Sequence, residues 1–163
     1  MPTSNYSLPE IKLLDSENWR EYALLDSGEG KTLERFGPYM LISPEPQAVW
    51  KKTLPPAEWQ KAHAVLREEN KEYGGSWQQL KPMEKAWEMH YQSLTFQLQL
   101  GTSRHIGVFP EQATHWDWIM ERVQSEKRPL RVLNLFGYSG LATLAAASTS
   151  SSSINAWLFT LVS

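Results

Sequence analysis

The sequence predicts an α+β unit followed by the first strand–turn–helix unit of a parallel α/β domain. Short strand-like segments occupy residues 20–104, and Leu94–Leu100 alternates apolar and polar side chains with a period of two. After them, Pro110–Ala147 reads as a proline-initiated helix, an apolar strand, a glycine turn and a second helix. The chain has 163 residues, about the length of one average domain.

Composition excludes several classes of protein. The net charge of −2 and the pI near 6.1 do not indicate a strongly basic nucleic-acid-binding protein, although a local basic patch is compatible with them. The absence of cysteine excludes disulfides, thiolate zinc sites, iron–sulfur clusters and a cysteine nucleophile. No signal-like start and no apolar run of about 18 residues is present. We therefore expect a soluble, cytoplasmic protein with no membrane partner.

The first elements read as a β-hairpin with a third strand. Glu21–Asp26 and Lys31–Phe36 flank the link Ser27–Gly30, whose glycines favour a tight turn. Tyr39–Ile42 follows Gly37-Pro38 and predicts a further strand.

A helix is predicted next, over Pro55–Lys71. The apolar residues Trp59, Ala62, Val65 and Leu66 recur at helical spacing, and the proline pair suits a helix start. Gly74-Gly75 is expected to close this unit. Three more strands then follow, at Trp77–Leu80, Ala86–Tyr91 and Leu94–Leu100.

The second half begins with a helix predicted from Pro110 to Gln124. Its expected buried stripe is Ala113, Trp116, Met120 and Val123. A buried strand at Leu130–Phe136, a tight turn at Gly137–Gly140 and a helix at Leu141–Ala147 should follow.

The end of the chain has an unusual composition. No charged residue follows Arg131, and Ser148–Ser153 is a run of hydroxyl residues that leads to the apolar segment Ile154–Val162. A serine-rich run resembles a flexible linker, and the apolar segment has no evident partner. We expect the tail, residues 148–163, to be non-native or disordered.

Several segments resemble known functional motifs but lack a residue that the motif requires. Gly28–Thr32 imitates the end of a phosphate-binding P-loop but has Leu25 where the first glycine belongs. Gly137–Gly140 imitates a hydrolase nucleophile turn but continues with Leu141, and no histidine follows Ser139. No metal site is expected, because none of the four histidines has metal-ligand spacing: His63, His90, His105 and His115.

The strongest local signal is Arg131–Ala142, in which a strand passes through a glycine turn into a helix. Glycines allow close backbone approach to a ligand, and the free N–H groups at the helix start attract an anion. Such a turn carries the ligand at the carboxyl edge of nucleotide-binding sheets. By pattern alone, a purely structural turn is an equal alternative.

Three blocks of sequence, in order, resemble one family. Asn134–Gly140 resembles motif I of the class I S-adenosylmethionine (SAM)-dependent methyltransferases related to the bacterial 23S rRNA cytosine-C5 methyltransferases. Arg104–Ala113 resembles the family segment before the methyltransferase sheet, and Leu33–Tyr39 with Pro46–Trp50 resembles its N-terminal domain. The resemblance covers roughly residues 20–147.

The resemblance implies an α+β N-terminal domain, with mixed strands around one helix, followed by the first βα unit of a Rossmann-like α/β methyltransferase domain. The expected divisions are an extension at 1–19, domains at 20–104 and 105–147, and the tail. The implied cofactor is SAM and the implied substrate is RNA, with a role in rRNA processing. Arg104 is expected to meet substrate, catalytic residues are not assigned, and the residues implied to line the cofactor site are Phe109, Glu111, Gln112, Asn134, Phe136, Gly137, Tyr138, Ser139 and Gly140.

The sequence departs from the family after motif I. In the family, an acidic residue at the end of the second strand binds the ribose hydroxyls, and the substrate-binding and catalytic residues come later. Here the serine run replaces that path, and no acidic residue follows Arg131. We therefore expect a fragment, truncated after motif I and inactive on its own. The alternative is a non-catalytic RNA- or partner-binding module derived from such an enzyme.

Overall fold

The computed structural model describes most of the chain between Trp19 and Leu158. Apart from Leu13 and Trp19, the predicted N-terminal extension lies outside the described residues, as does most of the tail beyond Thr149. The described ranges are 19–70, 74–102, 104–128, 130–135, 137–149 and 155–158, with the backbone alone at 68–70, 74 and 155–158.

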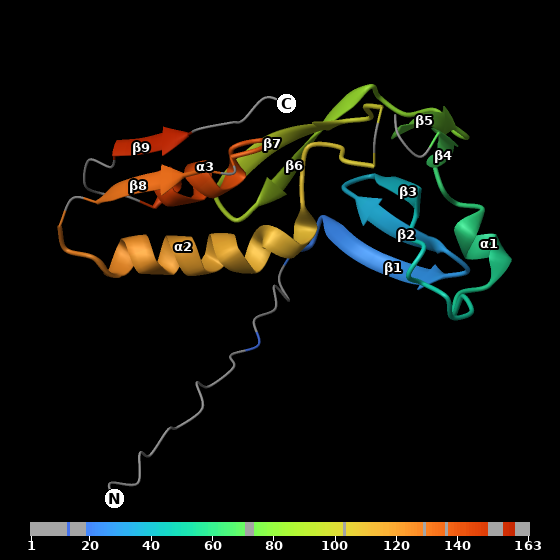
Figure 1. The fold of residues 1–163 in the computed structure, drawn as a ribbon, viewed down its shortest axis with the longest axis horizontal. Coiled ribbons are helices and arrows are strands. Elements are labelled where there is room, and N and C mark those ends of the chain that lie inside the picture. Colours follow the sequence, from blue (N-terminus) through green and yellow to red (C-terminus); the bar gives the residue numbers. More distant parts are fainter. Residues whose placement is uncertain are drawn as a thin grey trace, which may run out of the picture.

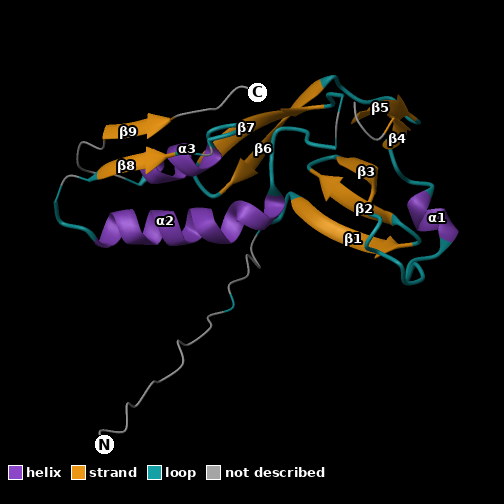
Figure 2. Cartoon of the chain, in the orientation of Figure 1, coloured by secondary structure: helices purple, strands orange, loops and turns teal. Residues whose placement is uncertain are grey.

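A five-stranded sheet occupies one end of the molecule (Figures 1 and 2). All its neighbouring strands are antiparallel except β3 and β4, which pair in parallel through Leu41 with Ala64 and Ile42 with Val65. The predicted hairpin and third strand are confirmed. In sheet order the strands are β1 (Tyr22–Gly28), β2 (Lys31–Phe36), β3 (Tyr39–Pro44), β4 (Ala64–Asn70) and β5 (Gly74–Gln79).

The helix predicted over Pro55–Lys71 is wrong. Only the single turn α1 (Pro56–Trp59) is helical, and the chain enters β4 at Ala64. Ala64, Val65 and Leu66 are all buried, because β4 packs side chains on both faces of the sheet. A strand buried on both faces shows no alternation, so its apolar run imitated a helical stripe.

Gly75 also differs from the prediction. It lies within β5 rather than closing a unit, and a Cβ at this position would collide with the carbonyl oxygen of Arg67 on β4. A glycine at this position allows β5 to lie close to β4 and does not form a turn.

The two faces of the sheet pack against different clusters. Phe36, Leu41 and Ala64 belong to the main hydrophobic core of the molecule. On the other face, Leu33, Trp59 and Ala62 form a smaller cluster beneath the loop that joins β3 to β4.

The main core continues into the rest of the chain through the predicted hairpin of β6 (Ala86–Tyr91) and β7 (Leu94–Gln99). In Figure 1 this hairpin is drawn above the long helix α2. Trp19 packs edge-on against Tyr91 and Trp116, with ring centroids 5.1 Å and 5.8 Å apart. One hydrophobic cluster therefore spans the predicted domain boundary at 104.

The C-terminal elements are a one-turn helix η1 (Pro110–Gln112), α2 (Ala113–Ser125), β8 (Arg131–Asn134), α3 (Leu141–Ser148) and β9 (Asn155–Leu158). The predicted stripe on α2 is confirmed, since Ala113, Trp116 and Met120 are buried and Val123 is half-buried.

One expectation about the C-terminal segment needs correction. The strand predicted to be buried exposes 60% of Leu133 and 55% of Leu135. Residues 155–158 of the tail form a strand, β9, which pairs in parallel with β8. In this register Arg131 lies opposite Asn155, and Asn134 lies opposite Leu158. With only β9 beside it among the described residues, β8 lies at a sheet edge and keeps one side open to solvent.

Candidate functional site

The turn between β8 and α3 is built on Gly140. Its φ of 85° and ψ of 3° are left-handed, a conformation that glycine adopts without the Cβ penalty. Its N–H donates to the carbonyl oxygen of Gly137 over 2.6 Å, and its own carbonyl accepts from the N–H of Leu144 over 2.9 Å. The chain thus enters α3 abruptly, and the first amides of the helix have no acceptor within the helix.

A cavity of about 350 Å³ lies beside this turn. It brings together most of the predicted site residues from two separate segments: Phe109, Glu111, Gln112, Gly137, Tyr138 and Ser139. Trp116, Leu141 and Ala142, which the sequence did not point to, complete the lining. The lining therefore comes from the loop before η1, from η1 itself, from α2, from the turn and from the start of α3.

Three of the predicted residues are not among those that line this cavity. Asn134 is not among the lining residues; its side-chain amide donates to the hydroxyl of Thr143 over 3.1 Å and ties the end of β8 to α3. Phe136 lies outside the described residues. Gly140 shapes the turn and is not itself part of the lining.

Three aromatic rings meet beside this cavity, and two of them, Phe109 and Tyr138, line it. Phe109 lies 4.8 Å from both Tyr138 and His105, measured between ring centroids. Tyr138 keeps 45% of its surface exposed and has a φ of 42°, rare for a residue with a Cβ. Strain of this kind, held by its surroundings, concentrates at ligand sites. His105 was not predicted, because only the folded chain brings its ring to 6.4 Å from the ring of Tyr138, measured between centroids.

Charge at this cavity comes from one side chain. Among the described lining residues, Glu111 is the only acidic or basic side chain, and it is exposed. Gln112 is already engaged, since its side-chain oxygen lies 2.8 Å from His115 Nδ1. The cavity therefore combines one free carboxylate, aromatic faces and the positive end of α3.

A second cavity of about 320 Å³ adjoins the first and shares Phe109 and Glu111 with it. Arg104 lines this second cavity and forms an ion pair with Glu45, with 3.3 Å between Nη1 and Oε2. Its predicted contact with substrate stays a prediction.

Tyr22 belongs to the wall that the sheet contributes to this second cavity. Its hydroxyl donates to Glu34 Oε1 over 2.9 Å. Burial, and then the Glu34 carboxylate, raise the pKa of Tyr22, so it remains a neutral hydrogen-bond donor at physiological pH.

No group of three or more His, Asp or Glu side chains in the described part of the chain is arranged to hold a metal ion. Within the same residues, no helix has the length and apolar character needed to cross a membrane.

Solved structures with a similar fold are methyltransferases. The structure of a SAM-dependent methyltransferase from Agrobacterium tumefaciens matches with a TM-score of 0.81 and 35% sequence identity, over 90% of this chain and 47% of that protein. The chain has a mixed α/β fold that matches part of a methyltransferase structure.

Two more distant structures share the fold. One is a Streptococcus mutans protein assigned as a SAM-dependent methyltransferase, with a TM-score of 0.56 and 13% identity over 83% of this chain and 38% of that protein. The other, SMU.776, is assigned as a methyltransferase and was solved with SAH; it matches with a TM-score of 0.53 and 14% identity over 83% and 37% of the two chains. This chain thus spans less than half the length of each of the three proteins. No family model and no curated protein sequence matches it.

The geometry of the turn leads to a prediction for Gly140→Val. A β-branched residue forced to a φ of 85° should destabilise the fold by roughly 1–3 kcal/mol. Thermal unfolding followed by circular dichroism measures the loss. Ser139→Ala, one residue earlier and exposed, is the control and should unfold like the unchanged protein. Equal stability of Gly140→Val and the parent would show that the turn does not depend on the left-handed residue.

Proposed function

We propose that this chain binds SAM in the cavity between η1 and the turn before α3, and that it forms the cofactor-binding part of an RNA methyltransferase. The observation that carries the proposal is the convergence of two separate segments, 109–112 and 137–139, on one cavity at the entry to α3. The structural likeness to a SAM-dependent methyltransferase at 35% identity supports it.

The residues at the cavity suit the parts of SAM. The unpaired amides at the start of α3 would meet the methionine carboxylate, an anion that helix N-termini favour. The ring faces of Phe109 and Tyr138 would pack against the flat adenine or the cationic sulfonium. Glu111 would accept hydrogen bonds from hydroxyl or ammonium groups. When bound, SAM supplies a methyl group activated by its sulfonium for transfer to a nucleophile.

RNA, and rRNA cytosine in particular, is our proposed substrate. The support is the resemblance of Asn134–Gly140 and Arg104–Ala113 to the corresponding blocks of the rRNA cytosine-C5 methyltransferases. The division into an N-terminal unit at 20–104 and a cofactor-binding unit from 105 belongs to the same proposal. So does the expectation that this chain alone transfers no methyl group.

Affinity for the cofactor should be weak. No acidic residue follows Arg131, so the ribose hydroxyls lack the carboxylate that the family resemblance implies. Two hydrogen bonds to a charged group are worth roughly 1.5–3 kcal/mol each, or about 10²–10⁴-fold in affinity. Binding in the millimolar range is therefore expected where a complete site would bind at micromolar concentration.

The test is titration of the chain with SAH, followed by NMR line broadening of the ligand. Tyr138→Ala should weaken binding by about tenfold, because a stacked aromatic side chain contributes roughly 1–3 kcal/mol. Trp118→Ala is the matched control: Trp118 exposes 57% of its surface against 45% for Tyr138, and it does not line the cavity.

Two outcomes would contradict the proposal. Absence of SAH binding at millimolar concentration would remove the cofactor assignment. Equal weakening by Tyr138→Ala and Trp118→Ala would show that SAH binds elsewhere. RNA binding without SAH binding would favour the alternative, a non-catalytic RNA-binding module.

A further inference from the structure

Another cavity shares no lining residue with the candidate cofactor site. It measures about 570 Å³, and strands β2, β3 and β4 line it together with α1 and the loop before it. Its apolar lining includes Ile42, Leu54, Trp59, Val65 and Leu80. We call it the loop groove.

The loop groove and the cavity that adjoins the candidate cofactor site lie on opposite faces of the five-stranded sheet. Side chains alternate along a strand, so Lys31 and Leu33 share one face of β2, whereas Glu34 and Phe36 share the other. Lys31 lines the loop groove, and Glu34 lines the cavity that adjoins the cofactor site.

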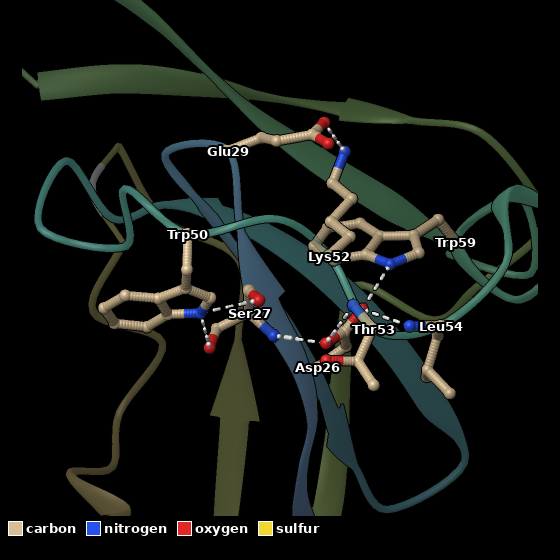
Figure 3. A network of polar contacts seen from close by, with 8 residues as sticks. All are labelled: Asp26, Ser27, Glu29, Trp50, Lys52, Thr53, Leu54 and Trp59. Atoms are coloured by element: carbon tan, nitrogen blue, oxygen red, sulfur yellow. Dashed lines mark hydrogen bonds and ion pairs between the residues drawn. The ribbon is translucent and has the colours of Figure 1, made fainter.

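Asp26 fixes the wall of the groove. Its carboxylate accepts hydrogen bonds from the backbone N–H of Thr53, the backbone N–H of Leu54 and the indole N–H of Trp59, over 2.9–3.2 Å (Figure 3). Lys52 crosses above, with its ammonium 3.1 Å from Glu29 Oε2 and 4.3 Å from the centroid of the Trp59 ring. The wall is therefore preformed and held by buried polar contacts.

The rim is cationic in a chain whose net charge is −2. Three cations, Lys31, Lys52 and Arg67, face one carboxylate, Glu29, which Lys52 already binds. Arg67 donates from Nε to the neutral side chain of Gln78 over 2.9 Å. Within the described residues, neither Lys31 nor Arg67 lies within ion-pair distance of a carboxylate.

Strand register places these two cations at the same level. Lys31 pairs with Pro44, and continuing the β3–β4 register beyond Ile42–Val65 brings Pro44 level with Arg67. Lys31 and Arg67 therefore lie on one face, two strand spacings apart, or about 10 Å. An apolar floor lies between them.

We propose that the loop groove binds a segment of single-stranded RNA, with phosphates at Lys31 and Arg67 and a base against the apolar floor. Cations that track a backbone, combined with apolar surface for bases, are the chemistry of single-strand binding. The choice of RNA rests on the proposed function. Because the groove is on the far face of the sheet, it anchors the substrate and takes no part in methyl transfer.

The experiment measures binding of a short labelled single-stranded oligoribonucleotide by fluorescence anisotropy at several salt concentrations. Lys31→Gln and Arg67→Gln should each weaken RNA binding several-fold. Each should also reduce the slope of log affinity against log salt concentration by about one, the amount that one phosphate contact contributes. Lys127→Gln, an exposed cation in the α2–β8 connection, is the matched control and should leave both unchanged. Thermal unfolding checks that all three variants keep the fold.

The remaining outcomes separate this proposal from its neighbours. If all three substitutions weaken RNA binding equally, the attraction is unspecific and the proposal is overturned. Undiminished RNA binding by Lys31→Gln and Arg67→Gln would overturn it as well. Full competition by inorganic phosphate or by an acidic peptide would assign the groove to that occupant instead. SAH titrations on the same variants should be unchanged, so loss of RNA binding with intact SAH binding, or the reverse, shows which of the two proposals fails.

Discussion

Gly28→Ala is expected to destabilise the protein by at least about 3 kcal/mol. Gly28 has a φ of 151°, and a Cβ there would lie 2.6 Å from the nitrogen of Lys52 and 2.9 Å from the carbonyl oxygen of Trp50. Both atoms are backbone, so neither can rotate away. The β1–β2 turn and the loop wall must separate, and the hydrogen bond from Glu29 N to Trp50 O, 2.8 Å in the protein, should be lost with them.

Gly30→Ala is the matched control. Gly30 lies in the same turn with a φ of 74°, but a Cβ there meets no atom within 4 Å. Its substitution should cost only the left-handed conformation, roughly 1–2 kcal/mol. Urea unfolding of both variants measures the difference, and equal losses would show that close approach at Gly28 is not what its position requires.

Asp26→Ala should cost about 3 kcal/mol. It leaves the amides of Thr53 and Leu54 and the indole N–H of Trp59 without their acceptor, and a buried unsatisfied donor costs roughly 1–3 kcal/mol. Water can reach the exposed Thr53, which keeps the total below the sum of three such penalties.

The Asp26 effect should depend on pH. Burial acts to raise the pKa of Asp26, but the donors of Leu54, Trp59, Thr53 and Ser27 outweigh it and hold the pKa below its ordinary value of 3.8. The unfolded chain therefore binds the proton first as the pH falls, and stability present above this value is lost below it. Unfolding of the parent and of Asp26→Ala at neutral pH and near pH 3 should show the gap narrowing in acid. A constant gap would mean that the ionised carboxylate is not what the loop needs.

The sequence predicted elements whose signals are local. The hairpin at β1–β2, the alternation in β7 and the stripe on α2 are confirmed because each needs only its own residues and one buried face. The segment 64–70 imitates a helix because Ala64, Val65 and Leu66 are all buried, although consecutive side chains of β4 point to opposite faces of the sheet. Burial of both faces depends on contacts with distant segments, which local spacing does not reveal.

The candidate site divides in the same way. The turn before α3 could be predicted from its glycines, and its φ confirms the need for Gly140. Trp116 and His105 reach the cavity region only because α2 and the preceding loop fold back onto α3. Nothing in the sequence indicated the loop groove. Lys31 and Arg67 come to lie on one face at the same level only through the parallel pairing of β3 with β4.

The main hydrophobic core also bears on synthesis of the chain. Trp19, near the beginning, shares that core with Ala145, near the end of the described helices. Residues 20–104 therefore leave the ribosome before the side chains of α2 and α3 that cover them are available. Their apolar surface, including the rings of Tyr91 and Phe96 that pack against Trp116 of α2 in the finished protein, stays open to chaperones or to other nascent chains until these helices have emerged.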